Sequence, residues 1–384
     1  MHLPENELRR VARHLALPGF GIEEQERLYN AHVLVIGAGG LGCPAMQSLA
    51  SAGIGTITVI DDDTVDLTNI HRQILFGAND VGKLKVDVAA KRLKELQPGI
   101  TVHALAQRLN TANAVEIVGS VDLVLDGSDS FSTKYLVADA AEITGTPLVW
   151  ATVLRYHGDL ALFHSGPHRR GVGLRDLFPQ QPDANSVPDC ATAGVLGATT
   201  ATMGALMATQ AIGYLSGIGA TEPGEMLSYD AFPPATRAYR VPADSQRSLT
   251  TELLDSYQGG DTEKACAVST RAEELLEAAR RGEYIAVDIR EPHEFLLADI
   301  PTDIESQKLP LSSLAGEDDV AGFFSSLWPH QSFELAGNQQ ALVYCAAGQR
   351  SDAFVDRYRE VAKRAGINLV SLPGGVNGLH TQRS

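Results

Sequence analysis

A glycine-rich segment directly after a hydrophobic run constrains the first half of this chain more than any other feature. Residues 32–36 (HVLVI) are apolar and β-branched, which is typical of a strand buried in a parallel sheet. The segment GAGGLG follows at once, and Gly37, Gly39 and Gly42 fit the G-x-G-x-x-G pattern of a strand–turn–helix junction. Asp61 ends the next predicted strand, where a carboxylate can bind ribose hydroxyls. The combination predicts a nucleotide site, and the alternative is a tight turn without a ligand.

Strands and helices alternate along this half of the chain. Residues 56–60, 121–125 and 147–150 are further apolar runs of strand length. Such alternation predicts an α/β fold with a Rossmann-like, doubly wound parallel sheet. Residues 191–215 are almost free of charge, but they are rich in Ala, Thr and Gly and lack flanking Lys or Arg. We therefore expect a buried helix there and not a membrane span.

The composition changes near residue 242, and a second, smaller α/β pattern follows. Residues 243–269 are polar, lack periodicity and contain a Gly-Gly pair, which predicts a linker between a domain at 1–242 and a domain at 270–384. The second domain has three predicted strands, at 284–288, 341–344 and 368–370, and two predicted helices, at 270–281 and 351–365. Residues 299–340 give no pattern that can be assigned.

Charge and cysteine content exclude several classes of protein. The chain has 31 Lys+Arg and 47 Asp+Glu, a formal net charge of −16, and such a surface repels nucleic-acid phosphates and anionic lipids. Cys43, Cys190, Cys266 and Cys345 are too few and too scattered for a disulfide framework. The N-terminus has no secretory signal pattern. We expect a cytoplasmic protein that binds neither nucleic acid nor membranes.

The glycine loop alone does not distinguish a nicotinamide cofactor from ATP. A dehydrogenase needs an acid or base where hydride is transferred, and the sequence offers no convincing one. Polar residues of another kind follow the second predicted strand: Asn69, Arg72, Gln73, Lys83, Lys85 and Asp129. Adenylation of a carboxylate needs cations at the phosphates and a carboxylate for Mg²⁺, which Arg72, Lys85 and Asp129 can supply. ATP is favoured, while an NAD-dependent oxidoreductase and a non-catalytic nucleotide-binding module remain alternatives.

Residues 8–242 resemble the adenylating enzymes that activate ubiquitin-like sulfur carriers in molybdopterin, thiamine and related biosynthesis. Seven segments carry the resemblance, in the same order: RVARH at 10–14, GAGGLG at 37–42, DDD at 61–63, NIHRQ at 69–73, GKLK at 82–85, DGSDS at 126–130 and VPDCA at 187–191. The resemblance implies a homodimer in which Arg13 reaches the partner's site. It also implies an acceptor, the C-terminal Gly-Gly carboxylate of a small carrier protein. The implied ATP site consists of Gly37, Gly39, Gly40, Gly42, Asp61, Asp63, Thr68, Asn69, Ile70, His71, Arg72, Gln73, Lys85, Asp129 and Ser130, with Asp129 holding Mg²⁺.

The chain departs from that family in two places. Many members hold a structural zinc ion with two C-x-x-C pairs. Residues 171–179 and 242–245, where these pairs would lie, contain no cysteine, so no zinc is expected. Ser130 stands where asparagine is usual. Because serine can still donate and accept a hydrogen bond, we expect an altered site and not an inactive one.

Two cysteines are candidates for sulfur chemistry. Cys190 matches a family cysteine that can form a thioester or persulfide link to the carrier, and the alternative is a buried small hydrophobe. Cys345 ends a predicted strand and opens the segment CAAGQRS before a helix. Backbone N–H groups, the helix dipole and Arg350 would lower a thiol pKa there.

The Cys345 segment is similar to the active-site loop of rhodanese-type sulfurtransferases. The segments DIREPHEF at 288–295 and PGG at 373–375 resemble other motifs of that family. The alternative is a cysteine at a strand end without chemistry. By this resemblance, residues 270–384 form a smaller α/β, rhodanese-like domain.

Together the motifs predict an enzyme with two linked activities. The first domain would adenylate the carrier with Mg-ATP, and the second would supply persulfide sulfur to form a carrier thiocarboxylate. The sulfur would come from a cysteine desulfurase or from thiosulfate. The predicted catalytic residues are Arg13, Arg72, Lys85, Asp129, Cys190, Cys345 and Arg350.

Overall fold

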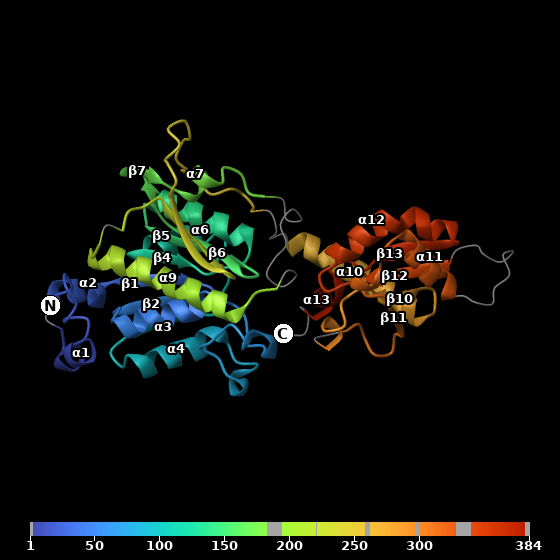
Figure 1. The fold of residues 1–384 in the computed structure, drawn as a ribbon, viewed down its shortest axis with the longest axis horizontal. Helices are drawn as coiled ribbons and strands as arrows, with labels where there is room; N and C mark the ends of the chain where they lie inside the picture. Colours follow the sequence, from blue (N-terminus) through green and yellow to red (C-terminus); the bar gives the residue numbers. More distant parts are fainter. Residues whose placement is uncertain are drawn as a thin grey trace. The chain divides into compact units, whose positions relative to one another are not determined.

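The chain divides into two compact units, each with its own sheet (Figure 1). The computed structural model describes residues 3–182, 194–219, 221–257, 262–296, 299–327 and 339–380. Unit 1 covers Met1–Gly260 and unit 2 covers Asp261–Ser384. The glycine loop lies in unit 1, and the Cys345 segment lies in unit 2.

Unit 1 is built on one sheet that is parallel in one half and antiparallel in the other. The parallel strands, in spatial order, are β3 (Thr101–Leu105), β2 (Thr56–Ile60), β1 (His32–Ile36), β4 (Leu123–Asp126) and β5 (Leu148–Leu154). The antiparallel strands are β6 (His157–Gly166), β8 (Glu225–Ala231) and β9 (Pro234–Arg240), with β7 (Arg169–Val172) paired to β6. The Rossmann-like parallel sheet is confirmed, whereas the sequence pattern did not indicate the antiparallel half.

Helices cover both faces of the parallel half of this sheet. They are α1 (Glu5–Arg10), α2 (Ile22–Asn30), α3 (Gly42–Ala52), α4 (Lys85–Leu96), α5 (Ala114–Gly119), α6 (Phe131–Thr144), α7 (Leu174–Leu177) and α9 (Gly197–Ser216), with 3₁₀ turns η1 (Leu67–Asn69) and η2 (Ala78–Asp80). Val33 of β1 lies in one core with Met46 of α3 and Met203 of α9. Its neighbour Leu34 lies in a second core with Tyr135 of α6. Alternate residues of a strand point to opposite faces, so both faces of β1 are buried.

Helix α9 forms in the segment where a buried helix was expected, residues 191–215, but only one of its faces is buried, and Ala205 and Thr209 are exposed. The buried face packs through small residues. A Cβ atom at Gly204 would lie 2.4 Å from Cγ of Pro44 and 2.6 Å from the carbonyl oxygen of Leu41. Only glycine allows α3 and α9 to approach so closely. None of the helices in the described part of the chain is long and apolar enough to cross a membrane.

The segment predicted as a linker, residues 243–269, has more structure than its composition indicates. Arg247 Nη2 lies 2.7 Å from Oε1 of Glu142, and the Tyr257 hydroxyl donates to Oδ2 of Asp139 at 2.7 Å. These contacts attach residues 243–257 to unit 1. Helix α10 (Thr262–Arg280) begins inside the same segment.

Unit 2 has a parallel sheet with helices on both faces. The strands, in spatial order, are β11 (Ser306–Lys308), β10 (Ile285–Asp288), β12 (Gln339–Tyr344) and β13 (Ile367–Ser371). Its helices are α10, α11 (Glu317–Ser326), α12 (Gln349–Arg364) and α13 (Gly375–His380), with 3₁₀ turns η3 (Glu294–Leu296) and η4 (Leu311–Ser313). Val343 of β12 packs with Phe324 and Phe354 of α11 and α12. Its neighbour Leu342 packs with Leu276 of α10 on the other face.

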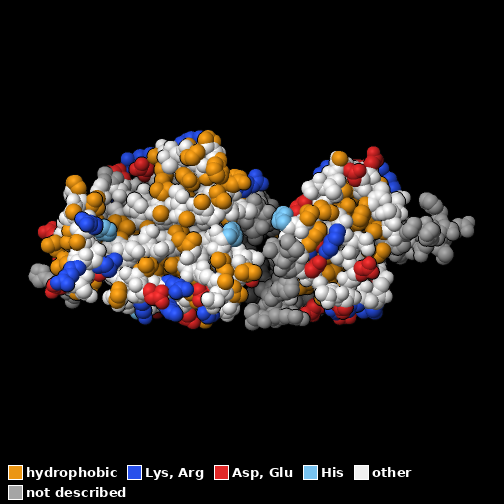
Figure 2. Space-filling view, turned by 60° about the horizontal axis from the view of Figure 1, so that its bottom comes forward, with side chains coloured by type: hydrophobic (Ala, Val, Ile, Leu, Met, Phe, Trp, Pro, Cys, Tyr) orange, Lys and Arg blue, Asp and Glu red, His pale blue; other side chains and the backbone are white. Residues whose placement is uncertain are grey.

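Several large apolar side chains are exposed on unit 1. Figure 2 shows hydrophobic side chains among charged ones of both signs on the face drawn. Leu67 is 68% exposed and Ile74 is 49% exposed. These two residues flank the segment that carries Arg72, which sequence analysis places at the nucleotide site.

Candidate active sites

The loop after β1 is closed by backbone packing that only glycine permits. Gly37 has a φ of +85°, and a Cβ atom at Gly42 would lie 1.9 Å from the Gly37 carbonyl oxygen. A Cβ atom at Gly37 would also lie 3.2 Å from the carbonyl oxygen of Gly127, which directly follows β4. The loop therefore lies at the carboxyl ends of β1 and β4. The order of the strands reverses at this point, and open α/β sheets bind ligands there.

Asp61 directly follows β2 and is hydrogen-bonded to this loop. Its Oδ2 accepts the N–H of Ala38 at 2.8 Å, and its Oδ1 accepts the N–H of Asp63 at 2.9 Å. Burial raises the pKa of Asp61 above its usual value, and the Lys85 ammonium and the two N–H groups partly oppose this effect. Each oxygen retains a lone pair that can accept a ribose hydroxyl. Asp61 therefore has an additional role, because its contact with Ala38 supports the glycine loop.

A buried ammonium group lies beside Asp61. Lys85 begins α4, and its Nζ lies 2.6 Å from Oδ2 of Asp63. The Lys85 side chain is 7% exposed, whereas the Asp63 side chain is 63% exposed. Carboxylate oxygens of Asp61, Asp62 and Asp63 come within 4.8 Å of one another, a spacing that could hold a metal ion. Exposed acidic groups are common without a metal, so this spacing alone assigns no site.

The segment with Arg72 reaches the loop from the side of α9. A Cβ atom at Gly40 would lie 3.5 Å from Cγ of Arg72 and 3.2 Å from Cγ2 of Thr200. The Arg72 guanidinium donates from Nη1 to the carbonyl oxygen of Thr68 at 2.9 Å and contacts Nε2 of His71 at 2.8 Å. Gln73 is buried, and its Oε1 accepts no hydrogen bond in the described part of the chain.

The remaining residues of the segment are held by their neighbours. Asn69 ends η1, and its Oδ1 accepts the N–H of Asp66 at 3.2 Å. Ile70, which directly follows η1, and His71 complete the segment. Burial and the adjacent Arg72 lower the pKa of His71 below its usual value.

The loop after β4 carries the predicted magnesium ligand. Asp129 is exposed, and Ser130 caps α6 by accepting the N–H of Thr133 at 3.2 Å. Sequence analysis missed a buried pair that supports this loop. Lys134 Nζ lies 3.5 Å from Oδ2 of Asp126 and 2.6 Å from the carbonyl oxygen of Ala151. Oδ1 of Asp126 accepts the N–H and the hydroxyl of Ser128, next to Asp129.

Two predicted residues of unit 1 lie apart from these contacts. Arg13 is exposed, after the end of α1, and makes no ion pair with a described residue. Cys190 lies outside the described residues. The structure thus brings together the glycine loop, Asp61, Asp63, Lys85 and Arg72 around one edge of the sheet.

In unit 2, Cys345 directly follows β12 in a loop shaped by glycines. Its Sγ accepts the N–H of Gly348 at 3.2 Å and lies 3.6 Å from Oγ of Ser351. A Cβ atom at Gly375 would lie 2.4 Å from the Cys345 carbonyl oxygen, and Val376 N–H donates to that oxygen at 3.0 Å. The PGG motif therefore packs against the cysteine loop. Helix α12 starts at Gln349, so its N-terminus lies beside the same loop.

Arg350 of α12 is paired with Glu294 of η3. Arg350 Nη1 lies 2.7 Å from Oε2 of Glu294, and Nη2 contacts Oε1. The N–H of Glu291 also donates to Oε2 at 2.9 Å. The charge of Arg350 interacts with Cys345, and hydrogen bonding to Glu294 raises the pKa of Arg350 above its usual value.

Comparison with known proteins identifies the family of each domain. A model of the ThiF family matches residues 11–250. The chain belongs to the ThiF family. A model of the rhodanese-like domain matches residues 271–382, after the ThiF domain.

The relatives combine both activities in one chain. The protein named "Probable adenylyltransferase/sulfurtransferase MoeZ" of Mycobacterium tuberculosis is 37% identical over 97% of this chain and 93% of its own length. The "Adenylyltransferase and sulfurtransferase MOCS3" of Bos taurus is 36% identical over 82% of this chain and 72% of its own length. This chain is therefore an enzyme with an adenylyltransferase domain of the ThiF family and a rhodanese-like sulfurtransferase domain. The oxidoreductase and the non-catalytic module left open by the glycine loop have no support among these relatives.

The ThiF domain also has relatives that lack the second domain. The "Sulfur carrier protein adenylyltransferase" of Thermus thermophilus is 44% identical over 66% of this chain and 97% of its own length. The crystal structure of Escherichia coli MccB with MccA-N7isoASN has a TM-score of 0.56 and 21% identity, over 63% of this chain and 74% of that one. At this identity, MccB supports the fold alone.

The segments of the ThiF domain that would carry zinc ligands are joined by charged residues. Four side chains, Glu142, Arg170, Asp176 and Arg247, form what we call the ionic clasp. Asp176 accepts hydrogen bonds from Arg170 at 2.8 Å, from Arg247 at 3.0 Å and from the N–H of Asp244 at 3.0 Å. Arg247 Nη2 also lies 2.7 Å from Oε1 of Glu142.

This donor set does not fit a zinc ion. The clasp offers neither thiolate nor imidazole, and two guanidinium groups occupy its centre, where they would repel a divalent cation. Its carboxylates are already satisfied by cationic and N–H donors. Burial acts to raise the pKa of Glu142, but hydrogen bonds from Arg247 and Thr250 outweigh it and lower the pKa to about 2.

Proposed function

We propose that this enzyme uses Mg-ATP to adenylate the C-terminal Gly-Gly carboxylate of a ubiquitin-like sulfur-carrier protein. The rhodanese-like domain then supplies sulfur, so that the carrier becomes a thiocarboxylate. The observation that carries the proposal is the presence of two different reaction centres in one chain. One has a buried ammonium, Lys85, beside a glycine loop, and the other has a thiol, Cys345, that accepts a backbone N–H.

In the first step, a carboxylate oxygen of the carrier attacks the α-phosphorus of ATP, and pyrophosphate leaves. Lys85 and Arg72 stabilise the negative charge that develops on the phosphate oxygens. The N–H groups of the glycine loop bind the phosphates, and Asp61 binds the ribose. Asp129 would hold the Mg²⁺ ion, which offsets charge on the phosphates. Ser130 and the segment from Thr68 to Gln73 complete the ATP site.

In the second step, Cys345 delivers sulfur. The Cys345 thiolate takes a sulfane sulfur from a donor, a cysteine desulfurase or thiosulfate, and becomes a persulfide. The terminal sulfur attacks the carbonyl carbon of the acyl-adenylate, and AMP leaves. A thiol then attacks Sγ of Cys345, the S–S bond breaks, and the thiocarboxylate is released. Cys190 is our candidate for this thiol, and Arg350 stabilises anionic sulfur in the loop.

We also propose an assembly and a cellular setting for the enzyme. We infer a homodimer in which Arg13 completes the partner's site, because exposed Leu67 and Ile74 beside the Arg72 segment offer apolar surface for a second subunit to cover. We propose that residues 1–242 carry the adenylating chemistry and residues 270–384 the sulfurtransferase chemistry, while residues 243–257 pack against the first domain. We also propose that the enzyme holds no zinc and acts in the reducing cytoplasm.

The decisive test is a reconstitution with a panel of Gly-Gly carriers. The enzyme is incubated with Mg-ATP, thiosulfate and one carrier at a time, and intact-mass spectrometry follows each carrier. The expected result is the exchange of one terminal oxygen for sulfur on one carrier. That carrier would then identify the pathway, whether molybdopterin, thiamine or related sulfur metabolism. Absence of exchange on every carrier, with ATP intact, would reject the proposal.

A further inference from the structure

Arg350, a cation that interacts with Cys345, already pairs with a carboxylate of unit 2. Two nitrogens of Arg350 contact the two carboxylate oxygens of Glu294, a bidentate arrangement that fixes both groups. The N–H of Glu291 adds a third donor to Glu294 at 2.9 Å. Both side chains are largely shielded from water, with Arg350 24% exposed and Glu294 15% exposed.

The charges around the loop do not favour an anion. The positive charge of Arg350 interacts with Glu294, Cys345 and Glu291. Burial acts to raise the pKa of Glu294, but hydrogen bonds from Arg350 and from Glu291 N–H outweigh it and hold the pKa below its usual value. Glu294 is therefore ionised at neutral pH. Among the described residues, two carboxylates, Glu294 and Glu291, thus offset the charge of Arg350 before a dianion approaches Cys345.

We propose that Glu294 is a specificity-determining residue of the cysteine loop, which neutralises Arg350 and disfavours dianionic sulfur donors. The proposal rests on the proposed role of Cys345 as the sulfur acceptor. In that reaction the Cys345 thiolate attacks the sulfane sulfur, and the donor's S–S bond breaks. With thiosulfate the electron pair leaves on sulfite. Donors with less negative charge, such as a protein cysteine persulfide, are favoured because they avoid repulsion by Glu294.

A pair of alkylating reagents measures this electrostatic effect without any sulfur transfer. Iodoacetamide and iodoacetate have the same leaving group and nearly the same size, but only iodoacetate is charged. The full-length enzyme is treated with each reagent, and peptide mass spectrometry gives the alkylation rate of Cys345. The ratio of the iodoacetamide rate to the iodoacetate rate reports the charge near the sulfur.

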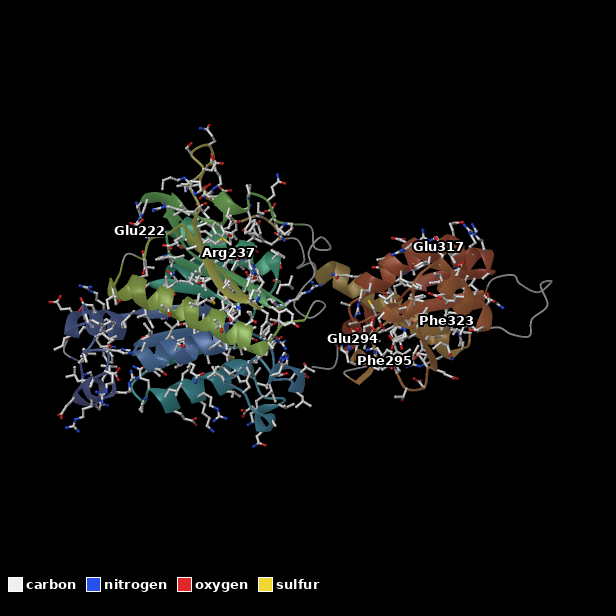
Figure 3. The ribbon with its side chains drawn as sticks, viewed as in Figure 1. Glu222, Arg237, Glu294, Phe295, Glu317 and Phe323 are labelled. Atoms are coloured by element: carbon white, nitrogen blue, oxygen red, sulfur yellow. The ribbon has the colours of Figure 1, made fainter. Side chains whose placement is uncertain are left out.

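The variant Glu294→Gln keeps the shape and one acceptor oxygen but removes the charge. We expect it to lower the rate ratio by roughly fivefold to tenfold, as one unit charge nearby would. We also expect kcat/KM for thiosulfate to rise by at least this factor, because thiosulfate carries two negative charges and iodoacetate carries one. The control is Glu317→Gln, which removes the same charge from an exposed site on α11, away from Glu294 in Figure 3. It should leave both quantities unchanged.

Two outcomes would overturn the inference in different ways. If Glu294→Gln leaves the rate ratio within twofold, or slows both reagents equally, Glu294 is only a structural partner of Arg350. If no donor of any charge forms a persulfide on wild-type Cys345, the proposed function of Cys345 fails, and the inference fails with it.

High salt should reduce the ratio of the iodoacetamide rate to the iodoacetate rate in the wild type, because ions screen the Glu294 charge.

Discussion

At the residue scale, the adenylation chemistry depends on the buried ammonium of Lys85. Replacing Lys85 by alanine removes a cation that stabilises developing phosphate charge, and such a loss costs on the order of 10²–10³ in rate. We expect Lys85→Ala to lower carrier-dependent ATP–pyrophosphate exchange by this factor. Lys83→Ala is the control, since Lys83 is more exposed and pairs with Asp80 at 3.0 Å. Exchange within a few-fold of wild type for Lys85→Ala would remove Lys85 from the site.

Cys345 provides a second prediction at the same scale. Cys345→Ser should abolish thiosulfate sulfurtransferase activity and carrier thiocarboxylate formation, yet leave pyrophosphate exchange intact. Cys43→Ala is the control, because burial raises the pKa of Cys43 to about 12 and its thiol stays protonated. Sulfur transfer should therefore survive in this variant. Thiocarboxylate formation by Cys345→Ser without added sulfide would show that another residue carries the sulfur.

Individual residues also show what the sequence can and cannot predict. Gly37 and Gly42 follow from the pattern alone, because the turn needs a positive φ and close backbone contact. The contacts of Asp61 with Ala38 N–H and of Glu294 with Arg350 depend on segments that lie far apart in the chain. The burial of Lys134 could not be predicted, since a lysine in a helix is usually exposed.

At the scale of elements, the ionic clasp joins α6, α7 and the segment after β9. Arg247→Ala would leave Glu142 buried without its cationic partner and Asp176 with Arg170 as its remaining one, which costs about 3–5 kcal/mol of unfolding free energy. The control is Arg240→Ala, whose pair with Glu222 is exposed and worth about 0–1 kcal/mol. Thermal and urea denaturation measure both variants. Equal stability of the two variants would contradict the role of the clasp.

The clasp also predicts a pH dependence. The pKa of Glu142 falls from 4.5 to about 2 on folding, so its stabilisation is complete above pH 4.5 and is lost as the pH falls towards 2. The unfolding free energy of the wild type should therefore decrease steeply across this window. Arg247→Ala should show a shallower decrease, measured by denaturant titrations at several pH values. Parallel pH profiles for the wild type and Arg247→Ala would argue against Glu142 as the source of this pH dependence.

Sequence patterns recover the central parallel strands but miss the antiparallel ones, including the largely buried β6. β1 and β2 were predicted with their observed bounds, because both are apolar and buried on both faces. β9 was missed, since most of its residues are exposed and polar. Residues 299–340 contain α11 and the short β11, whose few apolar residues give no clear period.

At the scale of the whole molecule, the proposed homodimer can be tested by complementation. Arg13 and Lys85 would belong to the same site but to different subunits. Mixing Arg13→Ala with Lys85→Ala subunits should restore part of the pyrophosphate exchange, because one hybrid site then keeps both residues. Sedimentation gives the oligomeric state in parallel. A fully active monomer, or no recovery on mixing, would refute a shared site.

The ionic clasp has a further consequence for an enzyme that handles reactive sulfur. Thiolates exchange with persulfides and are oxidised by them, so a metal centre built on cysteines would be exposed to the enzyme's own intermediates. Guanidinium and carboxylate groups undergo neither reaction. On our proposal that the enzyme holds no zinc, a ThiF domain joined by Glu142, Arg170, Asp176 and Arg247 would fold without drawing on the cell's zinc supply and would withstand the sulfur that passes through it.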